Sequence, residues 1–323
     1  MNKPLLLIPL LALTLVTAAC GQKQSATPAA TPPASNAAKP EAATAAIKAT
    51  DPYPNAALLA DVKWTEEHLK DSKVKIFDTR AKGYEQGHIP GAYALNSGLL
   101  KDSTNNTIAS KEKITELFQG LGVNSDTTVL LYDEGNSLNA SRVFYALEYY
   151  GLKDHVKVLN GGYAAWSVAA KEVSTDTPPA PVKGNFAAVP NDKLVTTKEQ
   201  LKALNLQQCV LLDVRSAKEY SGEDLRGNKK GGHIDKAVNR EWSDALDANS
   251  SDGVPRFKNY QDLSKAFDQT GVDKSKTIVP YCQTNIRGAH TYFTLRLLGY
   301  SDIRPYEGAF AEWGNADDTA VVK

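Results

Sequence analysis

Sulfur is scarce in this chain. Its 323 residues include three cysteines, Cys20, Cys209 and Cys282, and a single methionine, Met1. No cluster of His, Cys and Asp has the spacing of metal ligands, so we expect neither a metal nor an organic cofactor. With so few cysteines, the position of each one needs its own explanation.

Neither sign of charge is in excess. Lys and Arg together number 37, as do Asp and Glu, and no basic run or arginine-rich arm is present. Nucleic-acid binding normally requires a positive patch, so we expect no nucleic-acid partner. Hydrophobic residues make up 42% of the sequence, which is enough to bury a core, and the length allows about two domains.

The first residues have the layout of an export signal. Lys3 precedes an apolar run, 5–16, that is too short for a comfortable membrane span. Small residues directly before Cys20 resemble the bacterial lipoprotein signal, in which cleavage leaves a lipid-modified cysteine as the new first residue. We predict a signal peptide over 1–20 and a lipid anchor on Cys20, which places the protein in the bacterial cell envelope, facing the periplasm. Plain secretion with an incidental cysteine is the alternative.

Residues 21–50 are short of large apolar side chains. They are almost all Ala, Pro, Thr, Ser and Lys, and such a composition cannot repay the entropy of ordering. We predict a disordered tether with a reach of roughly 30 Å. A lipid anchor followed by this tether would hold a folded body clear of a membrane surface.

The rest of the sequence contains two copies of one pattern. In both copies an apolar run leads into Asp-x-Arg, a tyrosine and Gly-His-Ile; a second apolar run then leads into a helical pattern, and the copy ends near a tryptophan. The matching segments are 76–93 with 211–242, 129–152 with 277–300, and the stretches that end at Trp166 and Trp313. The second copy carries an insertion before Gly-His-Ile, rich in Gly, Lys and Asp.

The two copies predict two tandem domains. Residues 173–193 contain four prolines and break all periodicity. We therefore assign an N-terminal domain to 51–175, a linker to 176–192 and a C-terminal domain to 193–323. In each copy short β-rich apolar runs alternate with helical patterns, which predicts an α/β fold with a parallel sheet flanked by helices.

Cys282 follows an apolar strand and precedes a helix predicted to begin near Gly288. Ligands of open parallel sheets bind at this end of the strands. A tight loop here turns backbone N–H groups inward, and together with the helix dipole and Arg287 it favours a thiolate. The alternative is a small buried hydrophobe, which suits Cys209 at the start of its strand. The two cysteines then lie at opposite sheet edges, roughly 16 Å apart, so we expect no disulfide between them.

These motifs resemble the rhodanese (thiosulfate sulfurtransferase) family from about residue 55 to 315. The resemblance rests on Asp-x-Arg with Gly-His-Ile-Pro-Gly-Ala, the Cys-x4-Arg loop and the closing Glu-Gly-x-x-x-x-Trp-Gly. It implies two rhodanese-like domains, the first non-catalytic with Asp133 at the cysteine position. The second is implied to carry the sulfur on Cys282 as a persulfide, the nucleophile of the reaction.

The loop CQTNIR distinguishes among related activities. Related phosphatases use Cys-x5-Arg, one residue longer than the spacing from Cys282 to Arg287, so we do not favour a phosphatase. The loop is similar to those of some bacterial thiosulfate enzymes, although Thr284 stands where the animal enzyme has a lysine. We expect thiosulfate as donor, with 3-mercaptopyruvate as the alternative. The residues predicted to bind the substrate are Arg287, Arg215, Gln283, Thr284, Asn285 and Ile286.

Other shared residues are interpreted as structural. Asp213 and His233 match Asp78 and His88 of the copy without a cysteine, so we expect them to brace their loops. Trp166 and Trp313 end matching segments and suit core or lid packing. The second copy reads Gly-His-Ile-Asp-Lys-Ala where the family has Pro-Gly, which leaves the geometry of that turn open.

The sequence thus predicts a lipid-anchored sulfurtransferase that passes sulfur from thiosulfate, or a similar small donor, to a cellular thiol or, in assay, to cyanide. We expect a monomer whose only membrane contact is the lipid anchor. A different class stays open, namely a non-catalytic lipoprotein that binds or senses sulfur. Steady-state turnover would separate the two, because a sensor would release one burst of sulfite and stop.

Overall fold

A computed structural model describes residues 52–102, 104 and 107–323, which all belong to one compact unit. The predicted signal peptide, Cys20 and the tether lie outside the described residues. Among the residues that are described, no helix has both the length and the apolar character needed to cross a membrane.

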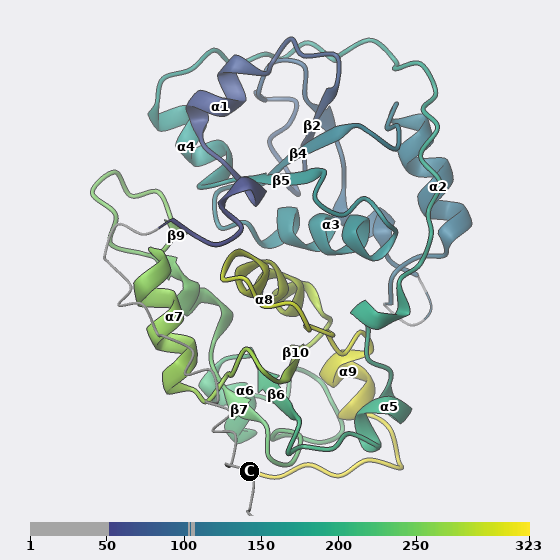
Figure 1. Cartoon of the computed structure of the whole chain (residues 1–323), viewed down its shortest axis with the longest axis vertical. Helices are drawn as coiled ribbons and strands as arrows, with labels where there is room; N and C mark the ends of the chain where they lie inside the picture. Colours follow the sequence, from purple (N-terminus) through teal and green to yellow (C-terminus); the bar gives the residue numbers. More distant parts are fainter. Residues whose placement is uncertain (1–51, 103, 105–106) are drawn as a thin grey trace, which may run out of the picture. The chain divides into compact units, whose positions relative to one another are not determined.

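The first copy folds around a five-stranded parallel sheet (Figure 1). Its strands, in the spatial order β1-β5-β4-β2-β3, are β1 (Leu59–Ala60), β5 (Val156–Leu159), β4 (Thr128–Tyr132), β2 (Val74–Asp78) and β3 (Tyr93–Ala94). Its helices are the 3-10 helices η1 (Ala56–Leu58) and η2 (Ser97–Leu100), and α1 (Val62–Glu67), α2 (Lys111–Gly120), α3 (Leu138–Tyr149) and α4 (Gly162–Val168). The strands are apolar on both faces because helices cover both.

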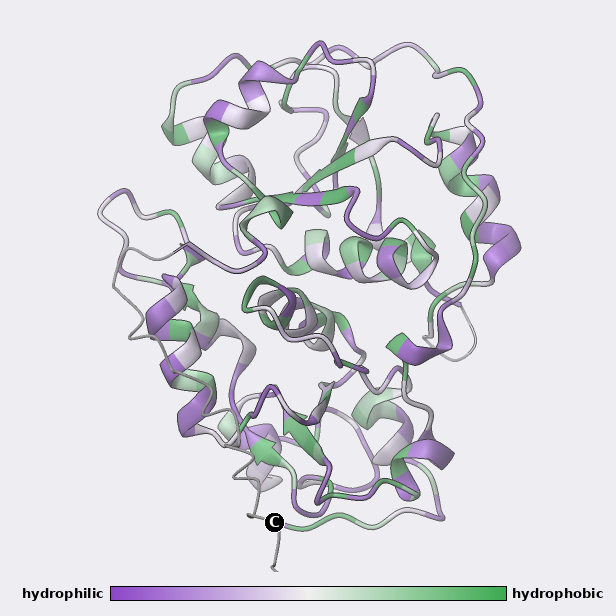
Figure 2. Cartoon of the chain, in the orientation of Figure 1, coloured by the Kyte–Doolittle hydropathy of each residue, from purple (hydrophilic) through white to green (hydrophobic). Residues whose placement is uncertain are grey.

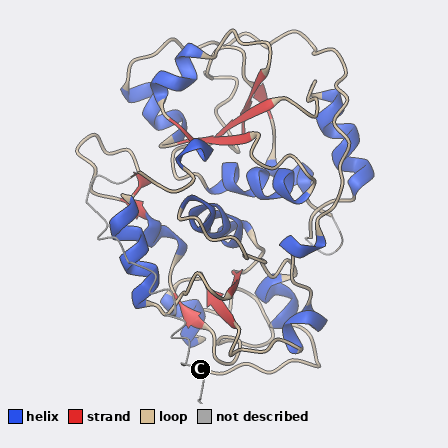
Figure 3. Ribbon diagram, in the orientation of Figure 1, coloured by secondary structure: helices blue, strands red, loops and turns tan. Residues whose placement is uncertain are grey.

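The second copy repeats this plan with fewer strands in its parallel sheet (Figure 3). Its parallel sheet has the order β10 (Thr277–Tyr281), β6 (Cys209–Asp213) and β7 (Val238–Asn239), and β8 (Leu246–Asp247) pairs with β9 (Arg256–Phe257). Its helices are η3 (Asp192–Leu194), α5 (Lys198–Lys202), α6 (Ala217–Ser221), η4 (Trp242–Ala245), α7 (Tyr260–Gln269), α8 (Ile286–Leu297) and α9 (Ala309–Trp313). Beside this sheet the backbone forms two isolated parallel bridges, from Ile303 to Ile278 and from Tyr306 to Thr196.

The predicted fold class is confirmed, since both copies are α/β with parallel sheets flanked by helices. Residues 176–191, all described, form neither helix nor strand. The domain borders themselves stay predictions. The outer helices α2 and α7 alternate between polar and apolar residues (Figure 2), and they bury Ile114 and Phe118, and Leu263 and Phe267, against their sheets.

The helices that follow β4 and β10, namely α3 and α8, pack against each other between the copies. Phe144 meets Phe293 edge-on with ring centroids 4.7 Å apart. Glu148 of α3 accepts hydrogen bonds from Tyr292 (2.7 Å) and from Arg296 Nε (2.9 Å) of α8. Both loops that precede these helices are therefore held at a shared, well-packed boundary.

Candidate active site

Cys282 follows the last residue of β10, and its side chain is buried, with the residue 1% exposed. Asn285 then adopts the left-handed conformation (φ 54°) and α8 begins at Ile286, two residues earlier than expected. Tyr281 pairs with Asp213 at the end of β6, so the Cys282 loop lies beside the loop that follows β6. Cys209 pairs with Thr277 at the other end of these strands, and neither described cysteine forms a disulfide.

Arg287 lies in the first turn of α8 and pairs with Glu219. Its Nη1 and Nη2 donate to the two carboxylate oxygens at 2.6 and 2.8 Å, and the guanidinium also reaches the Cys282 side chain. Glu219 caps α6 as well, because it accepts the backbone N–H of Ser216. Burial raises the pKa of Glu219, but the hydrogen bonds and charge of Arg287 outweigh it and hold that pKa at about 2.

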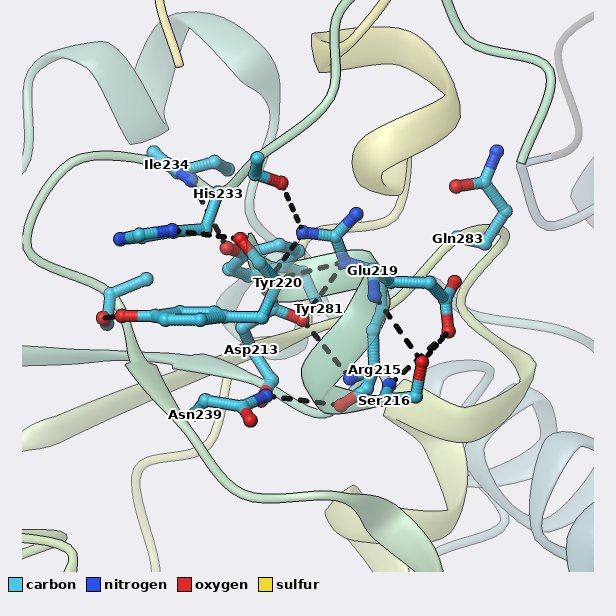
Figure 4. A network of polar contacts seen from close by, with 12 residues as sticks. Asp213, Arg215, Ser216, Glu219, Tyr220, His233, Ile234, Asn239, Tyr281 and Gln283 are labelled. Atoms are coloured by element: carbon cyan, nitrogen blue, oxygen red, sulfur yellow. Dashed lines mark hydrogen bonds and ion pairs between the residues drawn. The ribbon is translucent and has the colours of Figure 1, made fainter. Parts of the chain in front are cut away.

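Arg215 is placed differently from the expectation that it contacts substrate. It is 1% exposed, and its guanidinium donates to both carboxylate oxygens of Asp213 (Nη2 to Oδ2, 2.6 Å) and to the carbonyl of Gly232 (2.7 Å), as Figure 4 shows in part. It also stacks on Phe310, 3.7 Å from the ring centroid. These contacts occupy the guanidinium of Arg215 within its own loop, so we do not include Arg215 among the substrate-binding residues.

The first copy contains the same brace. Arg80 donates to Asp78 (2.6 Å) and to the carbonyl of Gly87 (2.6 Å), and lies 3.8 Å from the ring centroid of Tyr163. A contact present in the copy that lacks the cysteine serves the fold rather than the chemistry. Sequence resemblance assigned Arg215 to the substrate, whereas this internal comparison makes it structural.

The histidines of the two signatures are structural, as expected. His88 Nδ1 lies 2.9 Å from the carbonyl oxygen of Tyr84, and His233 Nδ1 lies 3.0 Å from that of Tyr220. Each histidine also stacks on its tyrosine ring. The turn after His233 is preserved because Lys236 adopts a positive φ of 60°.

The closing tryptophans make equivalent contacts. Trp166 donates from Nε1 to the carbonyl of Glu172, and Trp313 donates to that of Ala320, both at 2.8 Å. Both rings are buried, which agrees with core packing, one of the two roles expected for them.

Gln283 is held by the insertion of the second copy. Its side-chain amide exchanges two hydrogen bonds with the amide of Asn228, both at 3.0 Å. The carbonyl of Gln283 also accepts the N–H of Ala311 in α9 at 3.0 Å. The sequence showed the insertion but not its target, and the structure makes Asn228 a support of the cysteine loop.

Asn285 is tied to the first copy through Glu307. Its amide donates to the Glu307 carboxylate, which also receives two hydrogen bonds from the buried Arg142 of α3 at 2.6 and 3.1 Å. Lys101, at the end of η2, donates to the carbonyl of Thr284 at 3.4 Å. Sequence reasoning missed these partners, because only the closing Glu-Gly motif hinted at Glu307. Ile286 is the first residue of α8.

The loop after β4 shows what the loop after β10 can hold. Asp133 stands at the cysteine position, and its fully buried carboxylate accepts four backbone N–H groups, those of Gly135, Ser137, Asn139 and Ala140, at 3.0, 2.9, 3.0 and 3.4 Å. Burial raises the pKa of Asp133 to about 6 although these hydrogen bonds oppose it. The loop is thus an N–H cradle closed around a carboxyl group.

The two loops are anchored alike. The carbonyl of Asp133 accepts an N–H from the start of α4 at 2.8 Å, and that of Cys282 accepts one from the start of α9 at 2.8 Å. The residue before each helix, Ser137 or Asn285, is left-handed with φ of 59° or 54°. The second loop is one residue shorter. It therefore forms a smaller ring that places a thiol where the first loop has a carboxylate.

This site can hold a thiolate, or a negatively charged sulfur chain, between backbone donors and a paired arginine. Within the described residues, no group of three or more His, Cys, Asp and Glu is arranged to hold a metal ion. The site therefore consists of a buried cysteine in the loop between a parallel strand and its helix, in the second of two like domains.

Comparison with known proteins gives the family. The rhodanese-like domain matches residues 61–169 and 196–316, so the chain belongs to the rhodanese family and contains its domain twice. It is 32% identical over 287 residues to "Sulfur carrier protein TtuD" of Thermus thermophilus, which covers 84% of this chain and 98% of the relative. It is 30% identical over 270 residues to "Putative thiosulfate sulfurtransferase" of Mycobacterium tuberculosis, which covers 80% of this chain and 95% of the relative.

Solved structures support the fold. The complex of EanB with ergothioneine superposes with a TM-score of 0.76 at 24% identity, covering 84% of this chain and 72% of that one. YnjE superposes with a TM-score of 0.75 at 24% identity, covering 84% and 69%. These two likenesses speak to the fold alone. The family and the named relatives support sulfur transfer in general as the activity.

Proposed function

We propose that this protein is a sulfurtransferase that takes the outer sulfur of thiosulfate onto Cys282. The thiolate attacks that sulfur, a new S–S bond forms to Cys282, and the S–S bond of thiosulfate breaks with its electron pair leaving on sulfite. A second nucleophile then attacks the outer sulfur of the persulfide and regenerates the thiolate. Cyanide yields thiocyanate in this step, and a cellular thiol yields its own persulfide.

The loop of Asp133 carries the proposal. It shows that the backbone of this fold, between a central strand and its helix, surrounds an acidic side chain with four N–H donors. A similar cradle around Cys282 favours both the thiolate and the persulfide anion without a metal. The loop residues Gln283, Thr284, Asn285 and Ile286 supply this cradle through their backbone, and Arg287 adds a positive charge beside the sulfur.

Thiosulfate is favoured over 3-mercaptopyruvate as donor. Several relatives carry the name putative thiosulfate sulfurtransferase. The bidentate pair of Arg287 with Glu219 fits a loop-fastening role better than a contact with the sulfonate end of the donor. A carrier that stores one sulfur and awaits a specific acceptor is the second candidate, because one relative is named a sulfur carrier protein.

Steady-state kinetics distinguish these functions. With thiosulfate and cyanide we expect continuous formation of thiocyanate and sulfite by the wild type and by Cys209→Ser, and none by Cys282→Ser. One equivalent of sulfite without turnover would favour the carrier. Faster turnover with 3-mercaptopyruvate than with thiosulfate would replace the proposed donor.

We also propose that the mature protein is anchored to a bacterial membrane through lipidated Cys20, with the tether 21–50 holding the enzyme off the surface in the periplasm. The basis is the sequence of the first 50 residues. The full chain expressed in a bacterium should fractionate with membranes and incorporate labelled palmitate, and Cys20→Ala should lose the label. Palmitate incorporation that is unchanged in Cys20→Ala would rule out this anchor.

A further inference from the structure

The cations around the cysteine loop are mostly neutralised. Arg287 pairs with Glu219, Arg142 with Glu307, and Arg215 with Asp213, each through two or more hydrogen bonds to the carboxylate. A guanidinium that is bound to a carboxylate in this way has little capacity left for a second anion. The site described so far therefore lacks an obvious uncompensated charge to receive thiosulfate.

Lys101, from the first copy, is the exception. It follows η2, is half-buried, and donates from Nζ to the carbonyl of Thr284 at 3.4 Å, across 183 positions of sequence. Within the described part of the chain its ammonium makes no ion pair with a carboxylate. Burial and the neighbouring charge of Arg142 lower its pKa, while the charges of Glu307 and Cys282 oppose that change, so its charge acts on the thiol.

The two copies differ at this position in a manner that fits their loops. Leu246 follows η4 as Lys101 follows η2, and it is apolar and buried. The loop that needs to receive an anionic substrate thus meets a lysine from the other copy. The second copy itself therefore has Leu246, not a lysine, after η4. The Cys282 loop contains no lysine either, because Thr284 occupies the position at which the animal enzyme has one.

We propose that Lys101 is a donor-binding residue, through which the non-catalytic first copy supplies the cation that holds the sulfonate of thiosulfate at the Cys282 loop. This inference rests on the proposed function. The sulfonate keeps its charge while the outer sulfur moves, and the sulfite that leaves takes the electron pair of the broken bond. An ammonium at the loop rim therefore stabilises both the bound donor and its leaving group.

The same geometry predicts selectivity by charge. A donor with a sulfonate should gain more from Lys101 than one with a single carboxylate, and a neutral reagent should gain nothing. The hydrogen bond to the Thr284 carbonyl costs little to exchange, because at 3.4 Å it is long and the carbonyl can accept from elsewhere.

The test compares Lys101→Met and Lys101→Arg with Lys63→Met, a control on the exposed face of α1 with an 81% exposed side chain. We expect Lys101→Met to lower kcat/KM for thiosulfate about ten- to a hundred-fold, mainly by raising KM, and Lys101→Arg to recover most of it. The loss with 3-mercaptopyruvate should be smaller, and the cyanide half-reaction of the preformed persulfide should not change. Equal losses for both donors, or no loss, would overturn the proposal.

A second measurement does not depend on turnover. Cys282 is alkylated with anionic iodoacetate and with neutral iodoacetamide, in the Cys209→Ser background. Lys101→Met should lower the iodoacetate rate relative to the iodoacetamide rate at least several-fold, whereas Lys63→Met should leave this ratio unchanged. An unchanged ratio in Lys101→Met would refute the anion-binding role. If the wild type turned over no donor while the ratio shifted, the proposed function would fail and the anion site would stand.

Discussion

The loops after β4 and β10 share a backbone path, but their chemical roles differ. In the first loop the Asp133 carboxylate fills the N–H cradle permanently. In the second, Cys282 offers a smaller acidic group that can extend by one sulfur. The anion cradle is observed in the first loop. Under the proposed function the second loop holds the Cys282 thiolate in the same way, and activity depends on the thiol standing where the first loop has a fixed carboxylate.

The side chains that surround the two loops differ at two positions that act together. The second copy has Arg287 and Glu219, whereas the first has Asn139 in the first turn of α3 and Gly83 before the signature tyrosine, so both partners of the ion pair are missing together. The copy without the cysteine also lacks the pair that fastens the loop. This difference links the ion pair to the chemistry rather than to the fold.

The largest effect should come from exchanging the two side chains. Cys282→Asp installs the first copy's carboxylate in the second loop, and we expect sulfur transfer to fall below detection while the protein remains folded, because the cradle accepts a carboxylate. Turnover and thermal unfolding measure the two outcomes. The reverse change, Asp133→Cys in Cys282→Asp, should restore no turnover, since the first loop lacks Arg287 and Lys101 equivalents. Turnover restored by this exchange would show that the loop alone suffices.

Breaking the ion pair should have the next largest effect. Glu219→Gln leaves Arg287 without its partner and removes a charged cap of α6, so we expect a loss of about 1.5–3 kcal/mol in the free energy of unfolding and a lower kcat/KM. Glu67→Gln, which changes an exposed carboxylate on α1 of the first copy, is the control and should change neither stability nor activity. If Glu219→Gln instead raised the activity, the pair would be restraining Arg287 from substrate.

The same pair predicts a pH dependence. The folded-state pKa of Glu219 is about 2, below the ordinary value of 4.5, so its contribution to stability is full above pH 4.5 and is lost as pH falls toward 2. The wild type should lose more stability than Glu219→Gln over this range. Chemical denaturation at several pH values measures the difference, and parallel curves for the two proteins would contradict the assigned partner.

Removing the support of the insertion should have a smaller effect. Asn228→Ala deletes two hydrogen bonds to Gln283, and we expect about 1 kcal/mol less stability and a several-fold lower kcat. Gln207→Ala, at an exposed turn of the same copy, serves as control. A loss confined to stability would make the insertion a structural clamp with no influence on the loop during turnover.

The smallest effect concerns Asp133. Its folded-state pKa is raised to about 6 from 3.8, so the stability that it contributes is full below pH 3.8 and is lost as pH rises through 6. Asp133→Asn should remove this part of the pH profile while sulfur transfer at Cys282 stays near the wild-type rate. A profile that Asp133→Asn leaves unchanged would mean that the four N–H donors fully offset burial.

The sequence predicted the parts of the site that are local. The strand into Cys282, the tight loop and the helix lie within twenty-four consecutive residues, 277–300, and the repeat revealed which features are structural. The partners of the loop could not be predicted, because Glu219 contacts Arg287 across 68 positions and Lys101 contacts Thr284 across 183. Arg142 acts indirectly, since it pairs across 165 positions with Glu307, which binds Asn285. Arg215 shows the opposite failure. Its Asp-x-Arg motif was identified correctly from the sequence, but its side chain binds Asp213 and Gly232 of its own loop instead of facing the substrate site.

The most direct test of the central claim is the mass of the protein after treatment with stoichiometric thiosulfate and removal of the excess. If Cys282 occupies an anion cradle that stabilises a persulfide, the peptide that contains Cys282 should gain one sulfur atom, and one equivalent of sulfite should appear. The Cys209→Ser protein should behave identically, and Cys282→Asp should gain nothing. Sulfur found on the Cys209 peptide, or a persulfide that survives loss of Cys282, would contradict the account.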